Sequence, residues 1–155
     1  MSAAAAAGRR PDPAPHTRQR RGRVLALQVL YEVDLTGHPW QEALAEHAEA
    51  TGATKAVRGF AEASITGVLA EQGALDERLA RLAPLFPLAQ VAPVDRTLLR
   101  LALWELREGS HIPVRVVVNE AVELAKEFGT EASARFVNGV LGTALEETAP
   151  REPRP

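Results

Sequence analysis

Four arginines lie close together near the start of the chain: Arg18, Arg20, Arg21 and Arg23. The guanidinium group is planar and always charged, so it can pair with a phosphate through two hydrogen bonds or stack on an unpaired base. This cluster therefore predicts contact with a polyanion, and single-stranded RNA is the ligand that suits it. A solubilising tail without a partner is the alternative, and charge alone does not decide between them.

Charge is unevenly divided along the 155 residues. The net charge is −2, but residues 1–23 hold six arginines and one aspartate, which gives +5, and the remainder carries −7. A GC-rich genome would explain why arginine replaces lysine, but not why so many arginines gather here. The split indicates a basic arm attached to a body with no general affinity for nucleic acid.

A second group of polar and aromatic residues lies near the carboxyl end, at Arg135, Phe136 and Asn138. On a helix Phe136 lies about 100° from the core position Val137, so it can either seal the core or stack on a base. Asn138 either satisfies a nearby backbone group or approaches the RNA. Glycine inside a helix costs about 1 kcal/mol relative to alanine, and we expect close helix packing to explain Gly139 and Gly142.

Residues that could support catalysis are present but not organised. The histidines are scattered and form no metal-ligand motif: His16, His38, His47 and His111. There is no phosphate-binding glycine loop, nucleophile elbow or metalloprotease helix, and Asp76 and Glu77 point to different faces of a helix. The absence of cysteine excludes disulfides and thiolate metal sites. We therefore predict a protein that is not an enzyme and needs no metal or cofactor.

No stretch reaches the roughly 18 to 20 apolar residues that a membrane-spanning helix needs, and no signal core follows the arginines. We expect a cytoplasmic protein that makes no membrane contact.

The elements that must position these residues are helices, because apolar side chains recur at three- and four-residue steps. The predicted fold is all-α, a compact bundle of about seven helices. Residues 1–16 are expected to be a disordered arm, residues 17–148 the helical domain and residues 149–155 a disordered tail. The expected helices are 17–36, ending at Gly37, then 40–50, 54–72, 75–82, 94–107, 113–128 and a last one capped by Thr130.

Residues 119–141, NEAVELAKEFGTEASARFVNGVL, read together with the arginine cluster, resemble the NusB transcription antitermination family. The resemblance covers about residues 20–147 and includes ALQVLY at 26–31, VDR at 94–96 and WEL at 104–106. It implies two small three-helix subdomains packed crosswise. It also implies binding of the boxA element of nascent ribosomal RNA leaders with the ribosomal protein NusE, which helps the RNA polymerase elongation complex to resist termination.

The resemblance also implies roles for single residues. Periodicity alone favours a core position for Tyr31, whereas the family places an RNA-contacting tyrosine there. Arg135 and Phe136 become RNA-binding residues on the same basis. Ala132 departs from the pattern, because the family often has a polar or acidic side chain there, and this leaves the details of RNA preference open.

Glu105 interrupts a helix that is apolar on most sides. The NusB pattern places it on the surface that faces NusE. An internal ion pair with Arg100 or Arg107 is the alternative.

Two other functions remain compatible with this sequence. One is a protein-only helical adaptor or homodimer, in which the arginines are incidental. The other is an RNA-binding module that works with a separately encoded ribosomal RNA methyltransferase.

Overall fold

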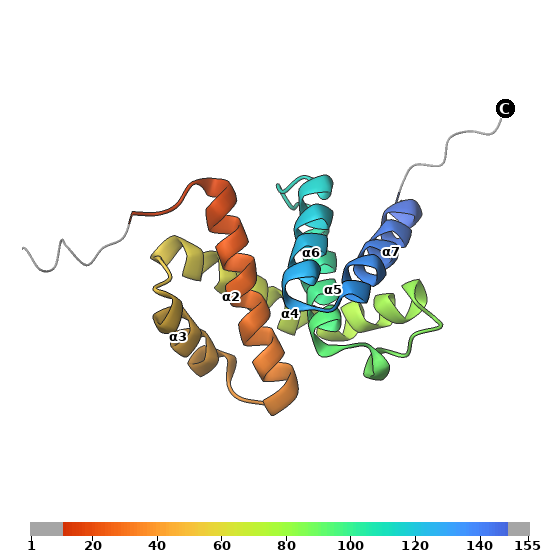
Figure 1. The fold of residues 1–155 in the computed structure, drawn as a ribbon, viewed down its shortest axis with the longest axis horizontal. Coiled ribbons are helices and arrows are strands. Elements are labelled where there is room, and N and C mark those ends of the chain that lie inside the picture. The colour runs from red at the N-terminus through yellow and green to blue at the C-terminus, as the bar shows by residue number, and fades with distance from the viewer. Residues whose placement is uncertain (1–10, 149–155) are drawn as a thin grey trace, which may run out of the picture. The chain divides into compact units, whose positions relative to one another are not determined.

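The computed structural model describes residues 11–148, and every regular element in that range is helical (Figure 1). The range holds six α-helices and one short 3-10 turn: α2 (Pro15–Thr36), α3 (Trp40–Thr51), α4 (Lys55–Leu82), η1 (Leu88–Gln90), α5 (Pro93–Glu105), α6 (Val114–Phe128) and α7 (Glu131–Thr148). The prediction of an all-α fold is confirmed. The disorder predicted for the arm and the tail falls mostly on residues 1–10 and 149–155, which lie outside the described range.

The chain divides into two compact units, residues 1–70 and residues 71–155, and the boundary falls inside α4. In the first unit, α2 packs against α3. In the second, α5 packs against both α6 and α7, and α6 packs against α7. The division agrees with the expectation of two small helical subdomains. Among the described helices, none combines the length and the hydrophobicity that a bilayer-spanning segment requires.

The helix ends follow the positions of proline and glycine. α2 begins at Pro15, two residues earlier than expected, because a proline fits the first turn, where its missing N–H costs nothing. Gly37 and Gly52 end α2 and α3 in the left-handed conformation, with φ of 71° and 65°. The predicted end of the first helix at Gly37 is confirmed, and α3 ends one residue beyond the predicted range 40–50.

α4 differs from the prediction, because the two helices expected at 54–72 and 75–82 form one continuous helix of 28 residues. Gly73 does not interrupt it. An exposed glycine costs a helix only about 1 kcal/mol, and adding residues to an existing helix is favourable, so one weak position does not force an end. The described fold therefore has six α-helices where about seven were expected.

The first unit depends on a close contact between α2 and α4. Gly22 is buried, and a Cβ atom there would lie 2.5 Å from Cδ1 of Phe60. Any side chain at Gly22 would require the Phe60 side chain or the helices to shift. The buried side chains of this unit include Leu27 and Leu30 from α2, Leu44 from α3 and Ile65 from α4.

The second unit is built around α5, whose leucines are buried on several sides of the helix, as its sequence predicted: Leu98, Leu99, Leu101 and Leu103. The expected core face of α7 is confirmed at Val137, Val140, Leu141 and Ala144. Arg100 of α5 is also buried, and its Nε and Nη2 atoms donate to the two carboxylate oxygens of Asp76 on α4, at 2.7 Å and 2.9 Å. This two-point ion pair joins the second half of α4 to α5.

Candidate nucleic-acid interface

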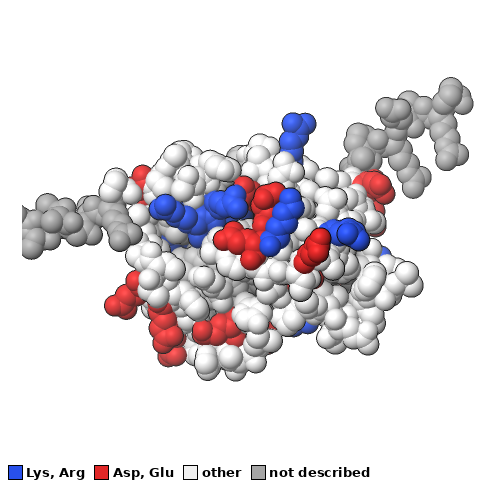
Figure 2. Space-filling model, in the orientation of Figure 1, with Lys and Arg blue, Asp and Glu red and all other residues white. Residues whose placement is uncertain are grey.

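The first turns of α2 hold three of the four predicted RNA-binding arginines at or near the surface. Arg21 is exposed, and Arg18 and Arg20 are partly exposed. Arg18 and Arg21 are three residues apart, so they are neighbours on one side of the helix. On the face drawn in Figure 2, basic side chains gather over the beginning of α2, whereas acidic side chains lie over α3.

The electrostatics of this helix end favour an anion. The N-cap residue Ala14 makes no side-chain capping bond, and the first turn of α2 has no acidic residue. Neither the cap nor the first turn supplies a negative charge, so the partial positive charge of the helix N-terminus adds to the charge of the arginines. Helix N-termini with free N–H groups bind phosphates for the same reason.

Arg23 lies apart from the other three. Its side chain is only 3% exposed, and its guanidinium carbon lies 5.5 Å from the centre of the Phe60 ring. This geometry is a cation–π contact between α2 and α4. Arg23 thus packs inside the first unit rather than presenting its charge with Arg18, Arg20 and Arg21.

Tyr31 lies on α2, 36% exposed. Eleven residues separate it from Arg20, which is close to three full turns, so the two lie on the same side of α2 and about 16 Å apart along the axis. An exposed ring on the same side as an arginine is available for stacking on a base.

The second set of predicted residues lies on α7 in the second unit. Arg135 and Asn138 are exposed and, being three residues apart, lie side by side. Phe136 is partly buried, and its ring packs against the ring of Phe86 with centroids 5.2 Å apart and planes at 68°. Phe86, in the segment after α4, was not anticipated, because nothing in a proline-rich connection indicates which face of the fold it will reach.

Glu105 is 4% exposed at the end of α5. The interpretation that its carboxylate marks an exposed strip for a partner protein is not supported by this burial, because a buried carboxylate is not available to a partner. The burial of Glu105 favours the alternative, in which its carboxylate pairs with a group inside the protein. Arg107, one of the expected pairing residues, places its guanidinium over the Trp104 ring, 3.6 Å from the centre.

The explanation expected for two α7 glycines is wrong. A Cβ atom added at Gly139 or at Gly142 would meet no described atom within 4 Å. Close helix packing therefore does not require a glycine at either position.

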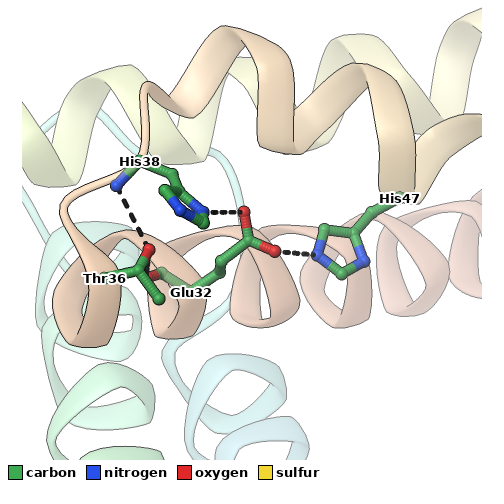
Figure 3. Close-up of polar contacts among 4 residues, drawn as sticks. All are labelled: Glu32, Thr36, His38 and His47. Atoms are coloured by element: carbon green, nitrogen blue, oxygen red, sulfur yellow. Dashed lines mark hydrogen bonds and ion pairs between the residues drawn. The ribbon is translucent and has the colours of Figure 1, made fainter.

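Two histidines that seemed scattered in the sequence meet at one carboxylate (Figure 3). Glu32 of α2 contacts Nε2 of His47 on α3 at 3.2 Å and Nδ1 of His38 in the connecting loop at 3.4 Å. The backbone N–H of His38 also donates to the Thr36 hydroxyl. Within residues 11–148, no group of three or more histidines and carboxylates has a geometry that would hold a metal ion. The contacts instead join α2 to α3.

Comparisons with a family model and with known relatives identify the same family. The model of the NusB family matches residues 20–146. The transcription antitermination protein NusB of Desulforudis audaxviator is 42% identical over 138 residues, covering 89% of this chain and 99% of that protein. The protein of the same name from Dehalococcoides mccartyi (strain 195) is 39% identical over 136 residues, covering 86% of this chain and 95% of that protein.

Solved structures agree. NusB of T. maritima superposes with a TM-score of 0.77 at 31% identity, covering 92% of this chain and 95% of that one. A chain in the crystal structure of the antitermination factors NusB and NusE in complex with double-stranded RNA superposes with a TM-score of 0.75, covering 88% and 100%. That second chain is 24% identical, so it supports the fold alone.

Proposed function

This chain belongs to the NusB family, and from that premise we propose that it is a transcription antitermination factor that binds boxA-like single-stranded RNA. The observation that carries the proposal is the family match over residues 20–146, which includes most of α2 and most of α7. The protein acts in the cytoplasm, on ribosomal RNA leader transcripts, together with NusE. It works by binding without bond chemistry and helps RNA polymerase to resist termination.

The exposed residues have complementary tasks in this function. Arg18, Arg20 and Arg21 supply charge for phosphates at the start of α2. Tyr31 supplies a ring for stacking from the same helix. From the second unit, α7 supplies Arg135 with the neighbouring Phe136 and Asn138.

Arg23 was predicted to bind RNA and Glu105 to bind NusE, but we assign both residues a role within the fold. Arg23 supports the first unit through Phe60, and its effect on RNA binding is indirect. Glu105 is 4% exposed in α5, so we assign it a role within the fold and not a direct contact with NusE.

Fluorescence anisotropy of a labelled boxA-type RNA, compared with a scrambled RNA of the same composition, tests the function. We expect selective binding of the boxA-type RNA, strengthened when NusE is added. Equal binding of both RNAs would reduce the arginines to a general polyanion contact. Binding to NusE without any binding to RNA would instead identify a protein-only adaptor.

A further inference from the structure

An apolar hollow of about 290 Å³ lies in the second unit, between the segment that follows α4 and one side of α7. We call it the α7 hollow. It is lined by the end of α4, by residues 84–86 and by residues of α7 that include Arg135, Phe136 and Gly139. Among the described residues that line it, Arg135 alone carries a charge.

Two large apolar side chains of this hollow are left in contact with solvent. Leu85 is 86% exposed and Phe86 is 55% exposed, although they lie only three and four residues after the end of α4, a helix that contributes to the core. Neither side chain is needed to fill the interior. A hollow bordered by exposed apolar groups is typical of a binding surface.

The aromatic rings give the hollow a shape suited to a flat ligand. The rings of Phe86 and Phe136 meet edge to face at 68°, so they form two inclined walls of one recess. A planar aromatic group that enters such a recess can stack on one ring and meet the other at its edge. A nucleobase has this form, and every base offers a face for stacking.

Gly139 is the feature that packing does not explain. It lies within α7, where glycine weakens a helix, and a Cβ atom there would meet no described atom within 4 Å. It also lines the hollow, one turn from Phe136. Side chains on a helix lean toward the preceding turn, so a larger residue at this position would lean over Arg135 and Phe136 and cover the recess.

Arg135 indicates what kind of group accompanies the planar ligand. It is exposed at the border of an otherwise uncharged hollow, where a guanidinium can pair with a phosphate. An aromatic recess beside one cation matches the two parts of a nucleotide, an uncharged base and an anionic phosphate.

We infer that the α7 hollow receives one base of the bound RNA, held by Phe86 together with Phe136, while Arg135 pairs with a neighbouring phosphate. Phe86 is then a further RNA-binding residue, and Gly139 keeps the recess open. The inference rests on the proposed function, because it takes RNA as the ligand.

The first test fills the hollow. Gly139→Leu is compared with Gly73→Leu, because Gly73 is also an exposed helical glycine of the second unit with no described atom within 4 Å of a Cβ, and it does not line the hollow. Both variants should melt at the same or a higher temperature than the wild type. In anisotropy with the boxA-type RNA, we expect Gly139→Leu to weaken binding by about 5- to 150-fold, the range of one stacking contact, and Gly73→Leu to leave it unchanged.

The second test locates the base. A series of boxA-type RNAs, each lacking one base, is titrated against the wild type and against Phe86→Ala. One missing base should weaken binding to the wild type, and the same missing base should have little further effect on Phe86→Ala.

The outcomes separate this inference from the proposed function. If the wild type binds the RNA selectively but Gly139→Leu and Phe86→Ala bind as well as it does, the hollow takes no base and only the inference fails. If Gly139→Leu loses NusE alone, the hollow is a protein site and the inference is again overturned. If the wild type binds no RNA, the proposed function and the inference fail together.

Discussion

At the scale of single residues, neighbouring arginines of one cluster have different surroundings. Arg21 is exposed, whereas Arg23, two residues later on the same helix, is 3% exposed and lies over the Phe60 ring. The sequence shows the charges but not the partner, because Phe60 belongs to a helix about forty positions away. The cluster could therefore be recognised in advance, but not the residue within it that faces inward.

Alanine substitutions at Arg21 and Arg23 should affect different properties, RNA affinity for the first and stability for the second. Arg21→Ala should weaken RNA binding and leave the free energy of unfolding within about 0.5 kcal/mol of the wild type, because its side chain is exposed. Arg23→Ala should lower the free energy of unfolding by about 1 to 3 kcal/mol, because it removes a buried stem and a cation–π contact. Urea denaturation and RNA anisotropy on both variants measure the two effects. Equal loss of RNA affinity with no change in stability would contradict the assignment.

Substitution of Glu105 can likewise distinguish an effect on stability from an effect on NusE binding. Glu105→Lys places a cation where a carboxylate is 4% exposed, and it should lower the free energy of unfolding by roughly 3 to 5 kcal/mol. Glu108→Lys makes the same change in charge at an exposed position and should have little effect on stability. Thermal and urea unfolding compare the two. A stable, folded Glu105→Lys protein that fails only to bind NusE would restore the partner-facing interpretation.

At the scale of elements, most helices were predictable but one boundary was not. Gly37 and Gly52 each end a helix, whereas Gly73 lies within α4 without interrupting it. All three are glycines between apolar runs, and their sequence signals are similar. The difference arises because a glycine permits the left-handed conformation but does not impose it. Whether a chain turns there depends on what the following residues can pack against.

Two glycine-to-alanine substitutions test this account of the helices. Gly22→Ala should lower the free energy of unfolding by about 1 to 3 kcal/mol, because the new methyl group would overlap the Phe60 ring. Gly73→Ala should raise the free energy of unfolding by up to about 1 kcal/mol, because the position is helical and open. Urea denaturation of both variants gives the values. A double variant, Gly22→Ala with Phe60→Leu, should recover part of the loss. A Gly22→Ala protein as stable as the wild type would show that the Phe60 ring or the helices can shift without cost.

At the scale of the whole molecule, the residues proposed for RNA binding are divided between the two units. Arg18, Arg20, Arg21 and Tyr31 belong to the first, and Arg135 and Phe136 to the second. The sequence resemblance identified these residues because they lie in recognisable segments. It could not identify Phe86, because the ring contact with Phe136 joins positions 50 residues apart and depends on the packing of the second unit.

The salt dependence of RNA binding tests how the two units contribute. If Arg18, Arg20, Arg21 and Arg135 together neutralise about three to four phosphates, log affinity should fall with log salt with a slope of about −2 to −3 for a single strand. The affinity should then decrease by roughly 16- to 64-fold between 50 and 200 mM salt. Neutralising the three α2 arginines together, as the Arg18→Gln, Arg20→Gln and Arg21→Gln variant, should reduce the slope to about −0.7, because Arg135 remains.

The matched control is Arg58→Gln, which removes an exposed arginine that lies in α4, outside the proposed interface, and should leave the slope unchanged. A triple variant that keeps the wild-type slope would place the phosphate contacts elsewhere on the protein. A slope near zero in the wild type would mean that charge pairing contributes little. The selectivity for boxA-type RNA would then depend on stacking by Tyr31 and Phe136, and the beginning of α2 would no longer be the site of phosphate binding.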